Sequence, residues 1–137
     1  MKTISIEATR ISPKRTTVAT GNGEYTIGRE GSPLEYLLGS LAGCFNVVGT
    51  ILADEMGIDI EDLEIGIEGD VDTRRYTGES TDPRAGFQDV RVTVRIESDA
   101  DRDTLQEWIA AVSDRCPVAD NLQNETSVGV TLDARSD

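Results

Sequence analysis

Two cysteines are the residues of this 137-residue chain whose chemistry is most informative. Cys44 lies inside a long apolar segment, and Cys116 stands directly before Pro117. A cysteine before a first-turn proline occupies a helix N-cap, where free N–H groups and the positive end of the helix dipole favour the thiolate. We therefore expect a lowered pKa for Cys116. Each cysteine alone is more often a small buried hydrophobe, but a pair can supply one attacking and one resolving thiol.

The composition excludes several classes of function. The chain has no histidine, which rules out Ser-His-Asp, Cys-His and His-ligated zinc mechanisms. Two cysteines are too few for a structural zinc site, so we expect no metal and no cofactor. A formal net charge of −13 argues against a nucleic-acid or anionic-lipid partner, because lysine and arginine supply most of the affinity for phosphate.

The charge and the N-terminus also suggest a compartment. The first ten residues lack the apolar core of a signal peptide, and we expect no apolar run long enough to span a bilayer. We predict a cytoplasmic protein without a lasting disulfide and without a membrane partner. Lys2 and Lys14 are the only lysines, and acidic residues occur along the whole chain. This pattern favours a halophile-like surface, although an ordinary acidic protein remains the alternative.

The N-terminal part of the chain alternates between apolar and polar residues in three short segments. These are Thr3–Ala8, Thr16–Ala19 and Glu24–Ile27, and Gly21-Asn22-Gly23 between the last two is a tight-turn signal. The pattern predicts a three-stranded antiparallel meander.

A long helix follows the predicted meander. Ser32, Pro33 and Glu35 form a capping box with proline at the first helical position, and Gly57 supplies a left-handed stop. Between positions 33 and 53 Glu35 is the only charged residue, so the helix must be covered on nearly all sides. A sheet on one side and a second copy of the chain on the other would cover it.

The clearest strands lie in the middle of the chain. Residues 63–71 and 90–96 alternate strictly between apolar and polar side chains, which is typical of strands with one wet face. The polar segment 72–89 between them is interpreted as a long loop or a frayed hairpin end.

Two helices and a final strand complete the prediction. The first helix begins at Asp101 or Asp103 and ends near Arg115. A second helical segment covers 116–122, and residues 127–132 are interpreted as a strand. One apolar stripe on the first of these helices is composed of Leu105, Trp108, Ile109 and Val112.

The order of these elements is βββ-α-ββ-α-α-β, which indicates an α+β fold. The chain has no internal repeat and no low-complexity tract, so we interpret residues 1–137 as a single domain. A domain of this length buries roughly two-thirds of the surface of its unfolded chain and needs no disulfide or metal to stabilise it.

Three segments carry a resemblance to a known family. Residues 32–44 and the helix that follows resemble the central helix of the family of osmotically inducible protein C (OsmC) and organic hydroperoxide resistance protein (Ohr), in its general OsmC-like branch. Residues 63–70 resemble the next strand of that family, and residues 116–122 resemble its second cysteine motif. The resemblance covers most of the chain from residue 32 onward.

The resemblance implies an interlocked homodimer with antiparallel sheets around a long central helix. It also implies a thiol peroxidase in oxidative stress defence. Cys44 would attack the O–O bond of an organic hydroperoxide or hydrogen peroxide and become a sulfenic acid. Cys116 would condense with it to an intramolecular disulfide, which an external dithiol would reduce. No metal or other cofactor takes part.

The chain departs from the family at the residues that polarise the peroxide. In the hydroperoxide-resistance branch a carboxylate directly follows the helix proline, and this position is Leu34 here. Glu35 is one residue later, and we favour a capping role for it over a catalytic one. The arginine of the family comes from the N-terminal strands, and the candidates are Arg10, Arg15 and Arg29, of which Arg15 is our first choice.

Two functions are therefore carried forward. The first is the thiol-dependent peroxidase. The alternative is an OsmC-like dimeric small-molecule binding or thiol-sensing protein without efficient peroxidase turnover, which the loss of the proline-adjacent carboxylate favours.

Overall fold

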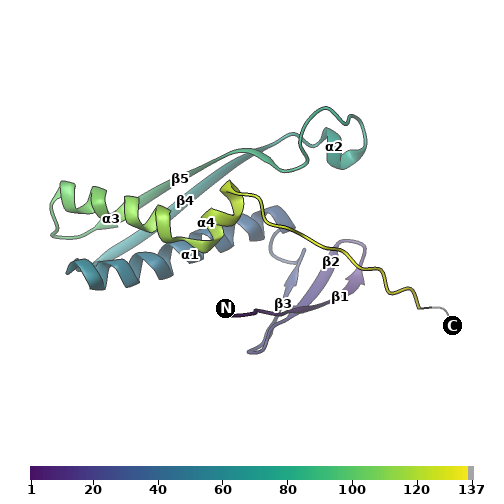
Figure 1. The fold of residues 1–137 in the computed structure, drawn as a ribbon, viewed down its shortest axis with the longest axis horizontal. Helices are drawn as coiled ribbons and strands as arrows, with labels where there is room; N and C mark the ends of the chain where they lie inside the picture. The colour runs from purple at the N-terminus through teal and green to yellow at the C-terminus, as the bar shows by residue number, and fades with distance from the viewer. Residues whose placement is uncertain (136–137) are drawn as a thin grey trace.

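The computed structural model describes residues 1–135 and contains two separate antiparallel sheets and a layer of helices (Figure 1). The three-stranded sheet lies beside the N-terminal end of the longest helix, away from the two-stranded hairpin (Figure 1). The elements in chain order are β1 (Glu7–Ser12), β2 (Arg15–Ala19), β3 (Glu24–Ile27), α1 (Pro33–Met56), β4 (Asp62–Val71), α2 (Arg74–Thr77), β5 (Phe87–Glu97), α3 (Arg102–Arg115) and α4 (Pro117–Gln123).

The predicted N-terminal meander is confirmed, with the strand order β1-β2-β3. Its first strand begins at Glu7, however, and not at Thr3 as the alternation indicated. The preceding residues Ile4 and Ile6 are exposed. Alternation shows that a segment can form a strand, but a strand also needs a neighbouring edge to pair with, and residues 3–6 have none within the chain.

The long helix is confirmed as α1, 24 residues from Pro33 to Met56. Ser32 Oγ accepts a hydrogen bond from Glu35 N at 3.3 Å, and Glu35 Oε1 accepts one from Ser32 N at 3.0 Å, which completes the predicted capping box. Gly57 ends the helix with a φ of 70°, in the left-handed region that favours glycine.

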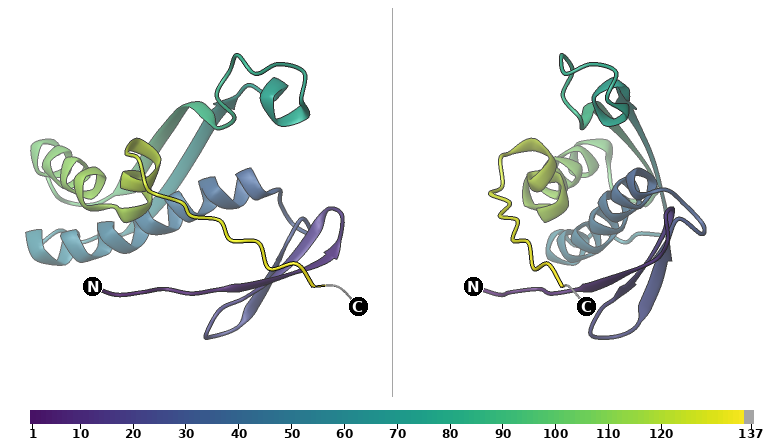
Figure 2. Two further views of the ribbon diagram at one scale, coloured as in Figure 1. Left: turned by 45° about the vertical axis from the view of Figure 1, so that its right-hand side comes forward. Right: turned by 90° about the vertical axis from the view of Figure 1, so that its right-hand side faces the viewer.

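The hairpin of β4 and β5 positions the helices. Its register pairs Leu63 with Ile96 and Ile67 with Val92, so every second side chain faces the helix layer. β5 is longer than predicted because it begins at Phe87, and the segment interpreted as a loop also contains the short helix α2. Both α1 and α3 lie on one face of the hairpin (Figure 2).

The hydrophobic core forms where α1, α3 and α4 meet this face of the hairpin. Trp108 is 2% exposed, which confirms that the predicted stripe of α3 belongs to the core. The buried members of the core are Leu41, Phe45, Val48, Leu52, Ala53, Ile58, Trp108, Val112, Cys116 and Ala119.

One expectation about the rest of the molecule was wrong. Residues 127–132 form no strand within this chain, and Val128, Val130 and Leu132 are exposed. α1 is long and apolar enough, by length and composition only, to cross a membrane, although no such segment was expected. Its charged residues lie near its two ends, which leaves the middle apolar, and core helices of soluble proteins meet the same test. The predicted order of elements otherwise holds from β1 to α4, with α2 added.

Candidate functional site

The structure brings Cys44 and Cys116 together. Cys44 lies in the middle of α1 and is partly exposed, whereas Cys116 is buried at the junction between α3 and α4. The two side chains lie close enough to interact, and Cys44 packs against the core cluster that contains Cys116. Two thiols far apart in the sequence therefore become neighbours in the core, the arrangement that disulfide formation requires.

The protonation of Cys116 differs from the prediction. Cys116 is the N-cap of α4, as expected, and its Sγ accepts a weak hydrogen bond from Ala119 N at 3.5 Å. Burial nevertheless raises the pKa of Cys116, and the neighbouring Cys44 side chain raises it further, against a smaller lowering by the backbone N–H groups of α4. Desolvation outweighs the helix terminus because the side chain has no exposed surface.

The two sulfur atoms therefore differ in protonation and in exposure. A thiol with a raised pKa stays protonated, so Cys116 can donate its proton to the sulfur of Cys44. Cys44 is the more accessible of the two side chains. A molecule that approaches from solvent can therefore contact Cys44, whereas Cys116 is buried in the core.

Two contacts fix α3 against α1 around the cysteine pair. Trp108 Nε1 donates a buried hydrogen bond to Gly49 O at 2.9 Å, five residues after Cys44. Arg115 donates two hydrogen bonds to the Glu55 carboxylate, at 2.8 and 3.2 Å. Sequence patterns could not reveal these contacts, because each joins residues about 60 positions apart.

Glu35 lies away from the cysteines, in the capping box at the start of α1. The backbone N–H of Ser32 lowers the pKa of the Glu35 carboxyl, and the Ser32 hydroxyl lowers it further. Glu35 also lines an open groove beside the stacked rings of Tyr25 and Tyr36, whose centroids are 5.7 Å apart. The geometry supports the capping interpretation of this residue.

None of the three candidate arginines reaches the cysteine pair within residues 1–135. Arg10 and Arg15 lie on β1 and β2, and Arg29 lies in the turn before α1. All three are exposed, and none forms an ion pair or a hydrogen bond with a described residue through its side chain.

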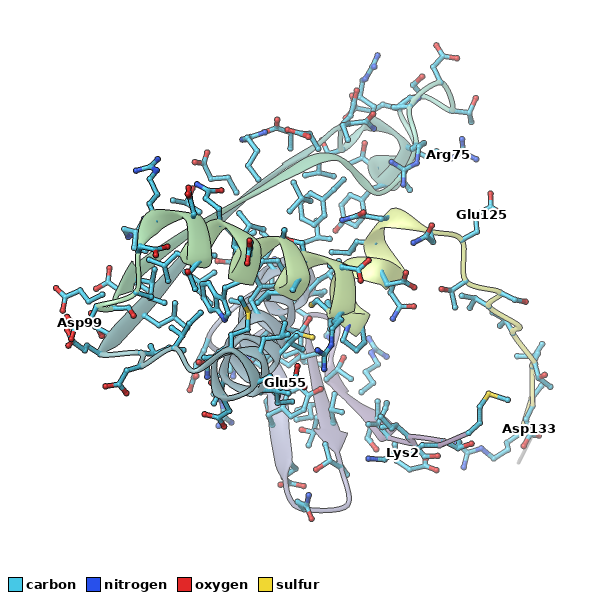
Figure 3. All side chains as sticks on the ribbon, turned by 60° about the vertical axis from the view of Figure 1, so that its left-hand side comes forward. Lys2, Glu55, Arg75, Asp99, Glu125 and Asp133 are labelled. Carbon is cyan, nitrogen blue, oxygen red and sulfur yellow. The ribbon has the colours of Figure 1, made fainter. Side chains whose placement is uncertain are left out.

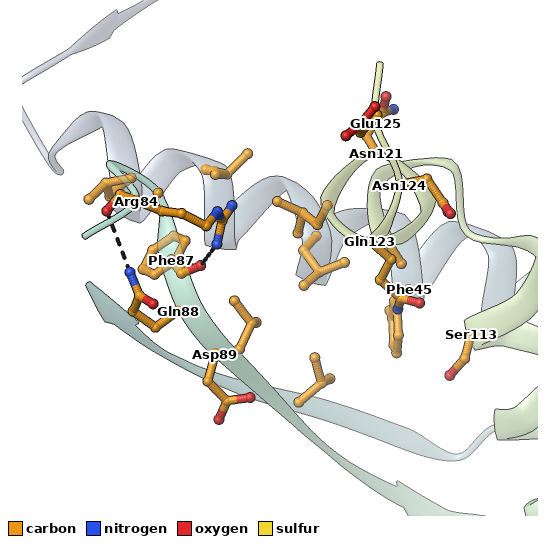
Figure 4. A pocket seen from close by; sticks show the side chains of 18 of the residues that line it. Phe45, Arg84, Phe87, Gln88, Asp89, Ser113, Asn121, Gln123, Asn124 and Glu125 are labelled. Carbon is orange, nitrogen blue, oxygen red and sulfur yellow. Dashed lines mark hydrogen bonds between the residues drawn. The ribbon is translucent and has the colours of Figure 1, made fainter. Parts of the chain in front are cut away.

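A cavity of about 860 Å³ lies between α1, β5, α3 and α4 (Figure 4). Phe45, which follows Cys44, and Ala119, which donates to Cys116 Sγ, line it, although neither cysteine does. Its wall is mixed, with apolar side chains from α1 and β5 and polar ones that include Asn121 and Glu125. Arg84 also lines it, and this guanidinium donates a hydrogen bond to Phe87 O at 2.8 Å. Sequence reasoning missed Arg84 because it falls in the segment interpreted as a loop.

No group of three or more metal-ligating side chains is found in the part of the chain that the structure describes. The cysteine pair itself offers thiol chemistry, with a partly exposed sulfur at Cys44 and a buried sulfur with a raised pKa at Cys116.

Most of the chain matches the sequence model of one protein family. The sequence model of a family described as OsmC-like protein matches residues 26–131. This range includes α1, the hairpin, both cysteines and α4. No curated protein sequence matches the chain.

Solved structures resemble the fold over nearly its whole length. An OsmC-like protein from Mycoplasma pneumoniae is 25% identical, with a TM-score of 0.79 over 89% of this chain and 88% of that chain. The organic hydroperoxide resistance protein OhrB of Bacillus subtilis is 21% identical, with a TM-score of 0.55 over 86% and 88%. A structure titled organic hydroperoxide resistance protein OsmC from Legionella pneumophila is 16% identical, with a TM-score of 0.61 over 90% of each chain.

Proposed function

This chain belongs to the OsmC-like protein family, and on that premise we propose that it is a thiol-dependent peroxidase in oxidative stress defence. The contact between the side chains of Cys44 and Cys116 is the observation that carries the proposal. Two relatives of known structure, from Bacillus subtilis and Legionella pneumophila, are named as organic hydroperoxide resistance proteins, which supports a peroxide as the substrate.

The chemistry proceeds in two steps that balance. The Cys44 thiolate attacks the O–O bond of an organic hydroperoxide or hydrogen peroxide, takes up one oxygen atom as a sulfenic acid, and releases an alcohol or water. The Cys116 thiol then attacks the Cys44 sulfur, so that a disulfide forms and a water molecule leaves. The two thiols together lose two electrons, and the peroxide gains them. An external dithiol returns two electrons and two protons to the disulfide.

We also propose that the chain forms a homodimer. α1 leaves Val47 and Ile51 exposed on one side, and residues 3–6 and 127–132 have no strand to pair with inside the chain. A second copy would cover these apolar surfaces and could bring Arg15 to the thiol pair, in a cytoplasmic protein without a nucleic-acid or membrane partner. Light scattering would then give about twice the mass of one chain.

Peroxide consumption with a dithiol reductant tests the function. Cys44→Ser should abolish turnover, because it removes the attacking sulfur. Cys116→Ser should allow one oxidation of Cys44 and then stall, because no thiol is left to resolve the sulfenic acid. Intact mass after one equivalent of hydroperoxide should fall by about two mass units in the wild type, as a disulfide requires. Turnover that survives Cys44→Ser would contradict the proposal.

A second candidate function rests on the surroundings of the thiols. Leu34 replaces the proline-adjacent carboxylate, and no candidate arginine lies at the cysteines within the described chain. These observations favour a dimeric small-molecule binding or thiol-sensing protein that lacks efficient turnover. The same assay separates the two candidates, because a sensor would form the disulfide once but would consume peroxide slowly.

A further inference from the structure

The ion pair between Glu55 and Arg115 joins α1 to the last residue of α3. Its two hydrogen bonds, from Nη1 to Oε2 at 2.8 Å and from Nη2 to Oε1 at 3.2 Å, give it the two-pronged geometry that fixes orientation as well as distance. The Arg115 guanidinium lowers the pKa of Glu55, so both groups are charged at neutral pH. Glu55 is labelled on α1 in Figure 3.

Arg115 directly precedes Cys116, where the chain leaves one helix and enters the next. Cys116 has an extended conformation, with φ −79° and ψ 112°, and it is both the C-cap of α3 and the N-cap of α4. The helical path is interrupted at this junction, because Cys116 has a non-helical backbone conformation and Pro117 has no N–H to donate. The position of Arg115 therefore influences where the Cys116 sulfur lies.

Disulfide formation requires the Cys116 sulfur at this junction to take a specific position relative to the Cys44 sulfur. The two free sulfur atoms must come together into a bond of about 2.05 Å, with a restricted dihedral angle. Trp108 holds the middle of α3 against Gly49, but it lies two helical turns before the cysteine. Of these two polar contacts between α1 and α3, the ion pair lies nearer to Cys116 in the sequence.

We propose that Glu55 and Arg115 are positioning residues that hold Cys116 in bonding reach of Cys44 and so favour the disulfide over the dithiol. The inference rests on the resolving role given to Cys116 under the proposed function. The effect on the disulfide equilibrium should be modest, since the side chains of Glu55 and Arg115 are 53% and 46% exposed. Pairs of this kind shift an equilibrium by about two- to fivefold.

Equilibration with glutathione measures this effect directly. Oxidised glutathione and the protein dithiol exchange to give the protein disulfide and two molecules of reduced glutathione, and alkylation followed by mass spectrometry gives the fraction oxidised. Glu55→Gln and Arg115→Gln should each lower the equilibrium constant for disulfide formation by about two- to fivefold. The charge-swapped double variant, Glu55→Arg with Arg115→Glu, should recover most of it, because it restores the pair.

The exposed pair of Glu64 and Arg95 provides the matched control. It joins β4 to β5 at 3.4 Å, away from the cysteines, so Arg95→Gln should leave the constant unchanged. A general loss of stability cancels in this measurement, since the dithiol and the disulfide are both folded. The inference is overturned if the Glu55 and Arg115 variants keep the wild-type constant, or if Arg95→Gln lowers it equally.

Failure of the inference can be told apart from failure of the proposed function. The glutathione experiment uses no peroxide, so a shift in the variants supports the inference even in a protein that consumes no peroxide. A wild type that forms no disulfide in oxidised glutathione would overturn both. Unchanged variants beside an active wild type would overturn the positioning role alone.

Discussion

At the scale of single residues, the decisive feature is the protonation of a buried thiol. Cys116 has no exposed surface, and desolvation raises the pKa of its thiol against the pull of the helix that it caps. A buried sulfur that keeps its proton is a poor first nucleophile, because the thiolate is the reactive form. Under the proposed function this thiol instead attacks a sulfenic acid on Cys44, and its proton leaves with the sulfenic hydroxyl as water.

The raised pKa of Cys116 predicts a pH dependence of stability. The folded state holds the thiol proton more tightly than the unfolded state, so this contribution is complete below the unfolded pKa and is lost as pH rises through the folded pKa. Under reducing conditions, the free energy of unfolding in urea should therefore fall above about pH 8.5, the ordinary thiol pKa. Cys116→Ala should show a smaller fall. Identical alkaline profiles for the two proteins would contradict the assignment.

At the scale of elements, the packing of α1 against α3 depends on the absence of a side chain at Gly49. A Cβ atom at this position would lie 3.0 Å from Cζ2 of Trp108, closer than an ordinary contact, and the buried indole has little room to move. The Trp108 hydrogen bond to Gly49 O requires the same close approach. The two helices therefore meet at one glycine and one tryptophan.

Gly49→Ala should destabilise the fold, with Gly43→Ala as its matched control. The first adds a methyl group against Trp108 and should cost about 1–3 kcal/mol by overpacking. The second lies on the same helix with no described atom within 4 Å of its Cβ position. There, alanine should stabilise a single chain by about 0.5–1 kcal/mol through helix propensity. Urea denaturation compares them, and equal effects of the two substitutions would contradict this account of the packing.

The elements that sequence could predict are those encoded locally. The capping box at Ser32 and the left-handed Gly57 define both ends of α1 from a few neighbouring residues. Alternation defines β4 and β5 in the same way. The strand predicted at 127–132 did not form, because alternation does not supply a partner edge. The pKa of Cys116 was predicted in the wrong direction, because burial depends on contacts with distant segments.

The candidate site was predictable only in part for the same reason. Two cysteines in motifs that resemble a family indicated a thiol pair, and the fold brings them together. Glu55 and Arg115 carry no local signal, since an acidic residue at one helix end and a basic residue at another are common surface features. The N-terminal strands gave three candidate arginines, and the roles of Arg10, Arg15 and Arg29 stay predictions.

At the scale of the whole molecule, charge dominates the surface. The formal net charge is −13, and no charged side chain among residues 1–135 is buried. The repulsion among these exposed carboxylates opposes the compact state, and dissolved ions weaken it. The arginines form ion pairs with some carboxylates, as Arg91 does with Asp70 at 2.9 Å, but they are too few to balance them.

Stability should therefore rise with the concentration of KCl. Screening reduces the repulsion between exposed carboxylates in the folded chain more than in the expanded unfolded chain, since the charges are closer together. Thermal unfolding followed by circular dichroism, from low salt to molar KCl, should give an increasing midpoint. Sorbitol at matched osmolality provides the control for solvent exclusion. A midpoint that does not depend on KCl would leave the ordinary acidic protein as the better interpretation.

The extended segment after α4 places valine, valine and leucine at alternate positions, 128, 130 and 132, so that they share one face. Bare apolar β-forming segments of this kind are the usual seeds of fibrils. Glu125 and Asp133 stand at its two ends (Figure 3), and charges that flank such a segment act as gatekeepers against uncontrolled stacking. By this rule, the same acidity that opposes the compact state also disfavours amyloid-like self-association of the segment.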